Sequence, residues 1–288
     1  MTIKTILVPL DGSDSSRTAL HTGIAMARDC EAHLNVVHVR ANPKDAVPLL
    51  GEGMSGAVIE DIIAAAEKEA VERARKSREI FDEVCSSQGI AWVDGPSATG
   101  GPTATWIEET GREDEVVAIR GRLADMIVVS RPTNETAVSA TMTLNAAMVE
   151  TGRGVLVVPP GGSDGFGKRV AISWNGSAEA ARAVAAAMPL IEGAEKVLIL
   201  TIDGDSASPN AATQLNDYLA WHGVNAEIET TPVSESQVGA TVLKRCGDWN
   251  ADLLVMGAYT HSRLRQLIMG GVTRHVLAEA TLPVVMVH

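Results

Sequence analysis

Aromatic residues are scarce in this 288-residue chain, with five Trp, two Tyr and two Phe making up only 3% of it. Proteins that bind single-stranded nucleic acid stack bases on aromatic side chains, and their phosphate contacts need clustered cations. The net charge is −12 and the pI is near 5.0, so the composition argues against general nucleic-acid binding. The cores must be filled by Val, Ile, Leu, Ala and Met.

Cysteine is also scarce, and long hydrophobic runs are lacking. Cys30, Cys85 and Cys246 are far apart and odd in number, so they show neither a disulfide framework nor metal-ligand spacing. We expect idle thiols in a reducing compartment and no metal site. No apolar run approaches the roughly 20 residues that cross a bilayer, and MTIKTILVPLDGS enters a strand without a cationic leader. We therefore expect a cytoplasmic protein without membrane contact.

The first part of the chain alternates apolar runs with amphipathic segments. Continuous Val, Ile and Leu runs are typical of strands covered on both faces, and strand–helix alternation predicts a parallel sheet with right-handed crossovers. Ser13 or Asp14 is suited to cap the first helix. The expected strands are 4–10, 33–39, 90–93, 125–129 and 154–158. The expected helices are 15–30, 57–87, 103–122, either continuous or broken at Gly111, and 139–151.

The pattern then restarts, which indicates an internal duplication. KRVAISWNGSAEAARAV (168–184) aligns with KTILVPLDGSDSSRTAL (4–20), ADLLVMG (251–257) aligns with ADMIVVS (124–130), and LPVVMVH aligns with GVLVVPP. The chain therefore holds two copies of one α/β unit, and its length suits two domains. We expect domains at 1–160 and 168–288, joined by a Pro- and Gly-rich linker at 161–167.

Acids are absent from residues 253–278, an unusual stretch in so acidic a chain. There Gly257 ends a buried strand, and Gly270 and Gly271 precede a helix. Glycine allows backbone N–H groups to approach a ligand closely, and a helix N-terminus attracts anions. With Arg263, Arg265 and Arg274 nearby, this pattern predicts a phosphate site. The alternative is a strand-to-helix turn whose glycines only cap and pack.

The first copy differs at the equivalent place. It carries Ser130-Arg131-Pro132-Thr133 after its fourth predicted strand and no glycine until Gly152. Proline removes a backbone N–H and fixes φ, which does not suit a phosphate cradle. Conversely, Asp11 follows the first strand of this copy where the second copy has Asn175. We expect the second copy to keep an anion site while the first serves as a scaffold.

The two strand-and-turn starts, ILVPLDGSDSS and VAISWNGSAEA, and the ending VMGAYTHSRLRQLIMGGVTRHVLAEATLPVVMVH together resemble the universal stress protein family in its tandem form. The resemblance covers essentially the whole chain. It implies two tandem five-stranded parallel-sheet domains of Rossmann-like (adenine nucleotide alpha hydrolase-like) fold. It also implies a pseudo-dimer in which the last strands, 155–158 and 284–287, face each other. Whether tandem chains form a further homodimer stays open.

ATP-binding members of this family carry G-x2-G-x9-G-(S/T) after the fourth strand. Gly257 and Gly270 fit the first and third positions, whereas Thr260 stands at the second and Gly271 replaces the Ser or Thr. Thr273, two residues further on, offers a hydroxyl instead. The spacing is intact, but two of the four identities differ.

The resemblance implies a stress-response protein that binds ATP or a related adenine nucleotide, with Mg²⁺ accompanying it. Such a protein acts through conformation or an unknown protein partner rather than by catalysis. The alternative, a nucleotide-free interaction scaffold of the same fold, is favoured by Thr260, Gly271 and Asn175. The implied nucleotide-binding residues are Asn175, Ile202, Gly257, Thr260, Gly270, Gly271, Val272 and Thr273, with Asp11 and Val39 as secondary base-side positions in the first domain.

No catalytic motif accompanies these residues. The chain has no G-x-S-x-G elbow and no H-E-x-x-H pair. Its DGSDSS stretch lacks the first serine and one glycine of the S-G-G-x-D-S loop found in adenylating enzymes. His261 and His275 have no carboxylate nearby in sequence to orient them. Trp174, beside Asn175, either packs or stacks on a base. At most, slow ATP hydrolysis is expected.

Overall fold

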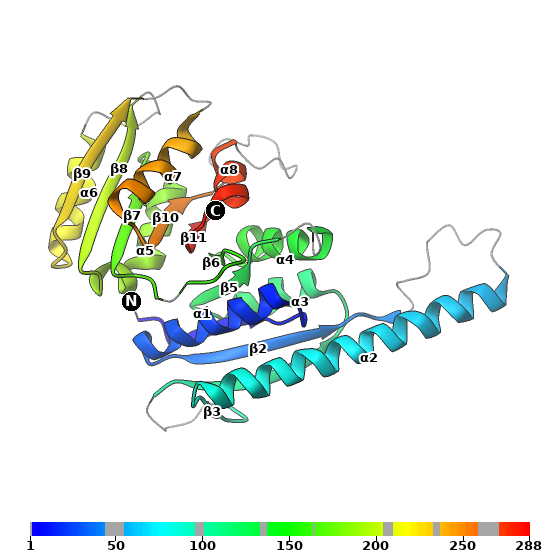
Figure 1. The fold of residues 1–288 in the computed structure, drawn as a ribbon. Helices are drawn as coiled ribbons and strands as arrows, with labels where there is room; N and C mark the ends of the chain where they lie inside the picture. Colours follow the sequence, from blue (N-terminus) through cyan, green and yellow to red (C-terminus); the bar gives the residue numbers. More distant parts are fainter. Residues whose placement is uncertain are drawn as a thin grey trace.

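The computed structural model describes residues 2–43, 55–95, 101–132, 137–163, 165–203, 210–232, 237–258 and 271–288. Strands alternate with helices along both halves of the chain, as the apolar runs predict (Figure 1). The strands of the first half are β1 (Thr5–Pro9), β2 (His33–Arg40), β3 (Ala91–Trp92), β4 (Thr103–Thr110), β5 (Met126–Ser130) and β6 (Gly154–Val158). Those of the second half are β7 (Arg169–Ser173), β8 (Lys196–Asp203), β9 (Ala226–Pro232), β10 (Leu253–Gly257) and β11 (Val284–Val287).

These strands form one sheet in the order β3-β4-β2-β1-β5-β6-β11-β10-β7-β8-β9. Neighbours within each half are parallel. Five strands in each half give the predicted doubly wound α/β fold, and β3 adds a two-residue strand at the edge of the first half. The helices are α1 (Asp14–Cys30), α2 (Gly56–Ser87), α3 (Glu113–Gly121), α4 (Ala137–Glu150), α5 (Ala178–Glu192), α6 (Ala211–Trp221), α7 (Val238–Trp249) and α8 (Gly271–Glu279).

The prediction of a helical stretch over 103–122, continuous or broken at Gly111, is wrong in its first part. Residues Thr103–Thr110 form β4, which pairs with β2 along all eight positions. Thr, Trp and Ile are branched or aromatic residues that suit a pleated surface better than a helix. Gly111 then adopts a φ of 148°, which ends the strand before α3 begins at Glu113. With β4, the first half has five sheet strands in addition to the short edge strand β3.

The two halves join through their last strands. β6 and β11 run antiparallel, with Val157 opposite Val284 and Leu156 opposite Val285. This pairing confirms the pseudo-dimer expected from the family resemblance. Because no sheet edge is left open at this seam, the two parallel sheets become one hydrogen-bonded layer.

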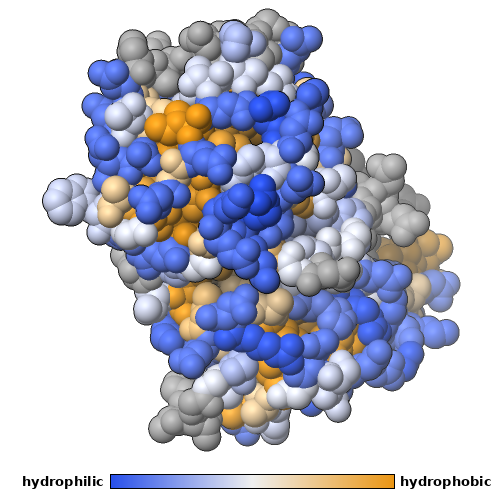
Figure 2. Space-filling model, turned by 60° about the vertical axis from the view of Figure 1, so that its left-hand side comes forward, coloured by the Kyte–Doolittle hydropathy of each residue, from blue (hydrophilic) through white to orange (hydrophobic). Residues whose placement is uncertain are grey.

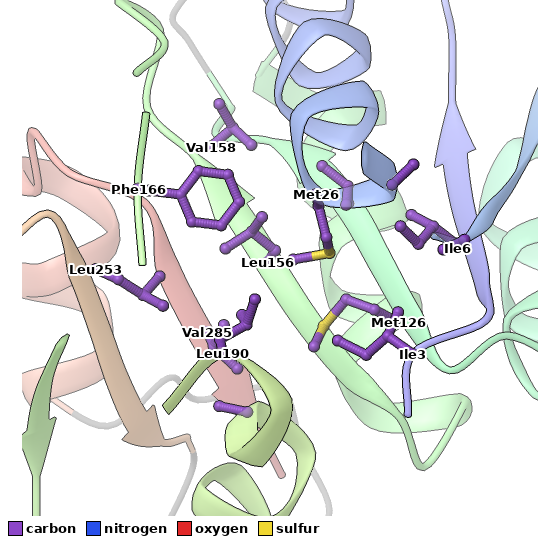
Figure 3. Packing of buried hydrophobic residues seen from close by; sticks show 14 of the residues in the cluster. Ile3, Ile6, Met26, Met126, Leu156, Val158, Phe166, Leu190, Leu253 and Val285 are labelled. Atoms are coloured by element: carbon purple, nitrogen blue, oxygen red, sulfur yellow. The ribbon is translucent and has the colours of Figure 1, made fainter. Parts of the chain in front are cut away.

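Each face of the sheet carries one apolar core that runs through both halves. Helices α1, α2, α5 and α6 pack on one face, and α3, α4, α7 and α8 pack on the other. Figure 3 shows the first core at the seam, where Met26 and Leu156 of the first half approach Leu253 and Val285 of the second. Phe166, from the connection between the halves, is only 9% exposed and packs into the same cluster.

An aspartate holds the first strand of each half in place. The Asp125 carboxylate accepts hydrogen bonds from the backbone N–H groups of Lys4 and Thr5, both at 2.9 Å. The Asp252 carboxylate accepts equivalent bonds from Gly167 at 2.8 Å and Arg169 at 3.0 Å. The Ala-Asp pair that recurs in the sequence therefore has the same structural role in both copies.

Polar residues cover most of the surface. Figure 2 shows a face on which hydrophilic residues predominate and hydrophobic residues appear in patches between them. This distribution follows from the sequence, because strands covered on both faces place their apolar residues inside. Among the helices that the structure describes, none is long and apolar enough to span a bilayer.

The seam predicts that both halves unfold together. Leu156 is fully buried, so Leu156→Ala should lower the free energy of unfolding by about 2–5 kcal/mol through lost burial and a residual cavity. Differential scanning calorimetry should show one transition, shifted as a whole. Leu123→Ala is the control, because Leu123 is 85% exposed and its loss should change stability by less than about 0.5 kcal/mol. Two transitions, of which one alone shifts, would contradict this expectation.

Candidate functional site

The second half has a topological switch point between β7 and β10. These two strands pair in parallel, with Ser173 beside Met256, while the chain continues outward from them in opposite directions. Ligands of open α/β sheets bind at the carboxyl ends of strands where the order reverses. Asn175 follows β7 and Gly257 ends β10, so the fold brings these two predicted site residues to the same edge.

The Asn175 side chain shapes the turn after β7. Its Oδ1 accepts a hydrogen bond from the backbone N–H of Ser177 at 3.1 Å, and Ser177 in turn caps α5 through the N–H of Ala180 at 3.1 Å. Trp174 has a packing role, because its Nε1–H donates to the Ala211 carbonyl at 3.0 Å and so holds the start of α6. These hydrogen bonds hold the turn at the switch point in place.

Gly257 lies against the first turn of α5. A Cβ at this position would lie 2.6 Å from the backbone nitrogen of Ala180 and 2.8 Å from the backbone carbon of Glu179. Neither backbone atom can move without displacing the helix. The glycine is therefore required for packing, which is the alternative that the sequence left open for this residue. Gly257 still lies at the switch point, so the packing role does not remove it from the candidate site.

We expect Gly257→Ala to destabilise the protein by about 1–3 kcal/mol, because the added methyl group overpacks the β10–α5 contact. Urea denaturation followed by circular dichroism measures the change. Gly247→Ala is the matched control, since Gly247 lies within α7 and a Cβ there meets no atom within 4 Å. Equal stability of the Gly257→Ala variant and the wild type would show that the contact is not tight.

Helix α8 begins at the same edge of the sheet. Gly271 is exposed, and a Cβ there would meet no described atom within 4 Å, whereas Val272 is half-buried and Thr273 is 4% exposed. His275 packs its ring against Gly239 of α7. Residues 259–270, which include the predicted Thr260 and Gly270, lie outside the described residues. The other predicted position, Ile202 near the end of β8, is 5% exposed.

The first half repeats the turn but not the rest of the site. Asp11 follows β1, and its Oδ1 accepts hydrogen bonds from the N–H of Ser13 at 2.9 Å and from its hydroxyl at 2.6 Å. Ser13 caps α1, as the sequence allows. Val39, the other base-side position, is 8% exposed near the end of β2. Asp11 and Asn175 thus make the same side-chain turn in their respective halves.

Arg131 occupies the position where the first half would need its phosphate loop. Its backbone N–H donates to the Val158 carbonyl at 2.8 Å, just as Ala258 donates to Val287 at 2.8 Å in the second half. The two residues are therefore structural equivalents. The Arg131 guanidinium reaches across the seam and donates to the Ala280 carbonyl at the end of α8. A cation at a helix C-terminus is favourable, so this residue supports the other half.

Glu113 is a buried acid that the sequence did not single out. It begins α3, and its Oε1 accepts a hydrogen bond from the Thr143 hydroxyl of α4 at 2.7 Å. Burial raises the pKa of Glu113 to about 7, with a further increase from the nearby Asp11 carboxylate and an opposing effect of Arg73. A break at Gly111 would place Glu113 near a helix start, but its burial and its proximity to Asp11 depend on tertiary packing that the sequence pattern does not show.

The raised pKa of Glu113 predicts that the stability of the protein falls as the pH rises from about 5 to 8. The unfolded chain ionises this carboxyl near its ordinary pKa of 4.5, whereas the folded state favours the neutral form up to about pH 7. Glu113→Gln should match the wild type at pH 5 and exceed its unfolding free energy by about 1–2 kcal/mol at pH 8. Urea melts at both pH values test this. A constant difference between the two proteins would contradict it.

No metal centre emerges from the described ranges, because nowhere in them do three His, Cys, Asp or Glu side chains gather closely enough to hold an ion. The candidate site is therefore the β7–β10 switch point, where Asn175, Gly257 and the start of α8 lie at one edge of the sheet. Its chemistry is that of binding: glycine backbone, a helix N-terminus and an amide side chain.

A doubly wound parallel sheet repeated within one chain, with a switch point in each half, is typical of nucleotide-binding-like α/β proteins. The sequence model of the universal stress protein family matches residues 2–133 and again residues 168–288. The chain therefore belongs to the universal stress protein family and carries two of its domains in tandem. No protein in a collection of curated proteins matches it.

Solved structures show the same architecture. A universal stress protein from Archaeoglobus fulgidus DSM 4304 superposes with a TM-score of 0.70 at 14% sequence identity, over 98% of this chain and 97% of that one. A functionally unknown protein from Pseudomonas aeruginosa PAO1 gives a TM-score of 0.56 at 12% identity, over 99% and 92% of the two chains. At these identities the likeness establishes the fold alone.

Proposed function

We propose that the second half binds ATP or a related adenine nucleotide and that the protein acts through conformation or a protein partner rather than by catalysis. The observation that carries this proposal is the meeting of Asn175, Gly257 and the open start of α8 at one switch point. The exposed Gly271 leaves the N-terminus of α8 unobstructed among the described residues, and such a terminus attracts phosphate. Mg²⁺ would enter with the nucleotide.

The absence of acids from the segment between β10 and the end of α8 favours phosphate, and Glu179 of α5, which lies against Gly257, is paired with Arg182. Between Asp252 and Glu279 the chain carries no carboxylate, while Arg274 of α8 is exposed. In the first half, Asp11 follows β1 at the corresponding place, and its carboxylate would repel phosphate. The second half has the uncharged amide of Asn175 there, so we place the nucleotide in the second half.

Gly271 allows a sharp test, because it is open and not required for packing. Gly271→Asp places an acid in the first turn of α8, where it favours the helix but repels phosphate. We expect isothermal titration calorimetry with MgATP to show affinity at least tenfold weaker, with unchanged or higher thermal stability. Gly271→Ser restores the residue type at the fourth position of the family motif, and we expect it to tighten binding.

Ser139→Asp is the matched control, because Ser139 is exposed in the first turn of α4 in the first half. It adds the same charge at the equivalent helix and should leave ATP affinity unchanged. If Ser139→Asp weakens binding as much as Gly271→Asp does, the nucleotide is not in the second half. If the wild type shows no heat of binding at millimolar MgATP, the protein is a nucleotide-free scaffold instead.

A further inference from the structure

The first half holds a cavity on the face of the sheet that α1 and α2 cover, and Val39, the base-side position of this half, is part of its lining. It has a volume of about 300 Å³ and lies between the carboxyl end of β2 and the middle of α2. The cavity lies at β2, whereas the switch point of this half lies between β1 and β5, on the other side of β1 from β2. The lining residues that matter for binding are Arg40, Pro43, Ala66, Glu69, Ala70 and Arg73.

The cavity exists because α2 is long and carries small residues at this level. The helix extends beyond the carboxyl end of β2, as Figure 1 shows. Where it covers the sheet, its inward stripe is bulky, with Ile80, Phe81 and Val84 buried. About three to four turns before Ile80 the same stripe has Ala70 and Ala66, which leave the space beside the end of β2 unfilled.

Strand alternation places the β2 side chains around this space. Leu34 and Val36 belong to the core on the α1 and α2 face, so His38 and Arg40 continue along that face. His38 is 1% exposed, its Nδ1–H donates to the Leu10 carbonyl at 2.8 Å, and its ring stacks on Trp106 with centroids 6.0 Å apart. His38 is thus a fixed inner wall.

The charge of the lining is positive. Arg40 and Arg73 contribute cations and Glu69 contributes an anion, but Glu69 is already paired with Arg73. Within the described part of the chain, Arg40 forms no ion pair. An uncompensated guanidinium beside apolar walls, in a chain of net charge −12, favours an anionic ligand with an apolar body.

We propose that this cavity is a binding site for a small organic anion, an apolar aliphatic or aromatic body that carries a carboxylate or sulfonate. The body lies against Ala66, Ala70 and Pro43, and the acid group pairs with Arg40 at the rim. A volume of about 300 Å³ is at the lower end of small-ligand sites, which limits the ligand to the size of a fused aromatic acid.

Two dyes that share one aromatic body test the proposal on the full-length protein. 8-Anilinonaphthalene-1-sulfonate carries the acid group, and N-phenyl-1-naphthylamine lacks it. We expect fluorescence titration to show saturable binding of the sulfonate and binding of the uncharged dye that is at least tenfold weaker. Arg40→Gln should weaken binding of the sulfonate about tenfold and leave the uncharged dye unaffected, whereas Arg122→Gln, an exposed arginine elsewhere in the first half, should change neither.

Filling the cavity provides a second test that does not involve charge. Ala66→Leu adds a side chain into the space and should weaken binding of both dyes at least tenfold, with near-UV circular dichroism unchanged. Ala64→Leu is the matched control, because Ala64 is exposed on the outer side of α2. Unchanged affinity of the Ala66→Leu variant, or equal effects of the two leucine variants, would overturn the proposal.

Competition with nucleotide separates this site from the proposed function. Millimolar MgATP and the Gly271→Asp substitution should leave sulfonate binding unchanged. Displacement of the sulfonate by MgATP would place the dye in the nucleotide site and overturn the assignment. A protein that binds the sulfonate in the cavity but shows no MgATP affinity would support this site while the nucleotide proposal fails.

Discussion

The antiparallel pairing of β6 with β11 is the contact on which the rest of the molecule depends. Parallel sheets are stable when both faces are covered and their edges are protected. Here each half protects the other's edge, and the two apolar cores become continuous across the seam. The connection between the halves contributes Phe166 to one of these cores, so even the linker is part of the packing.

The two halves of this shared framework have diverged in charge at their switch points. Both keep the side-chain turn after the first strand, made by Asp11 in one half and Asn175 in the other. The second half combines its turn with an open helix start, whereas the first surrounds its turn with Glu113 and the helices that bury it. The turn after the first strand thus carries an acid in one half and an amide in the other.

Much of the fold could be predicted from the sequence because the signals were local and repeated. Continuous Val, Ile and Leu runs identified the central strands, and the duplicated Ala-Asp pair marked equivalent places in both halves. The strand β4 was missed because its polar outer positions, such as Glu108 and Glu109, resemble a solvent-exposed helix, and its pairing with β2 is not visible in sequence. The roles of Gly257, Glu113 and Arg131 depend on neighbours from distant segments, which no spacing rule could supply.

The Arg131 contact makes the two halves of the duplication unequal. In a symmetric ancestor with two equal halves, each α8-type helix would have met the same partner residue. Here the first half supplies an arginine to the end of α8, whereas the equivalent residue in the second half is Ala258, whose methyl group has no such reach. A chain assembled from two copies of the second half would therefore lose the hydrogen bond between Arg131 and Ala280. The two halves are complementary and no longer interchangeable.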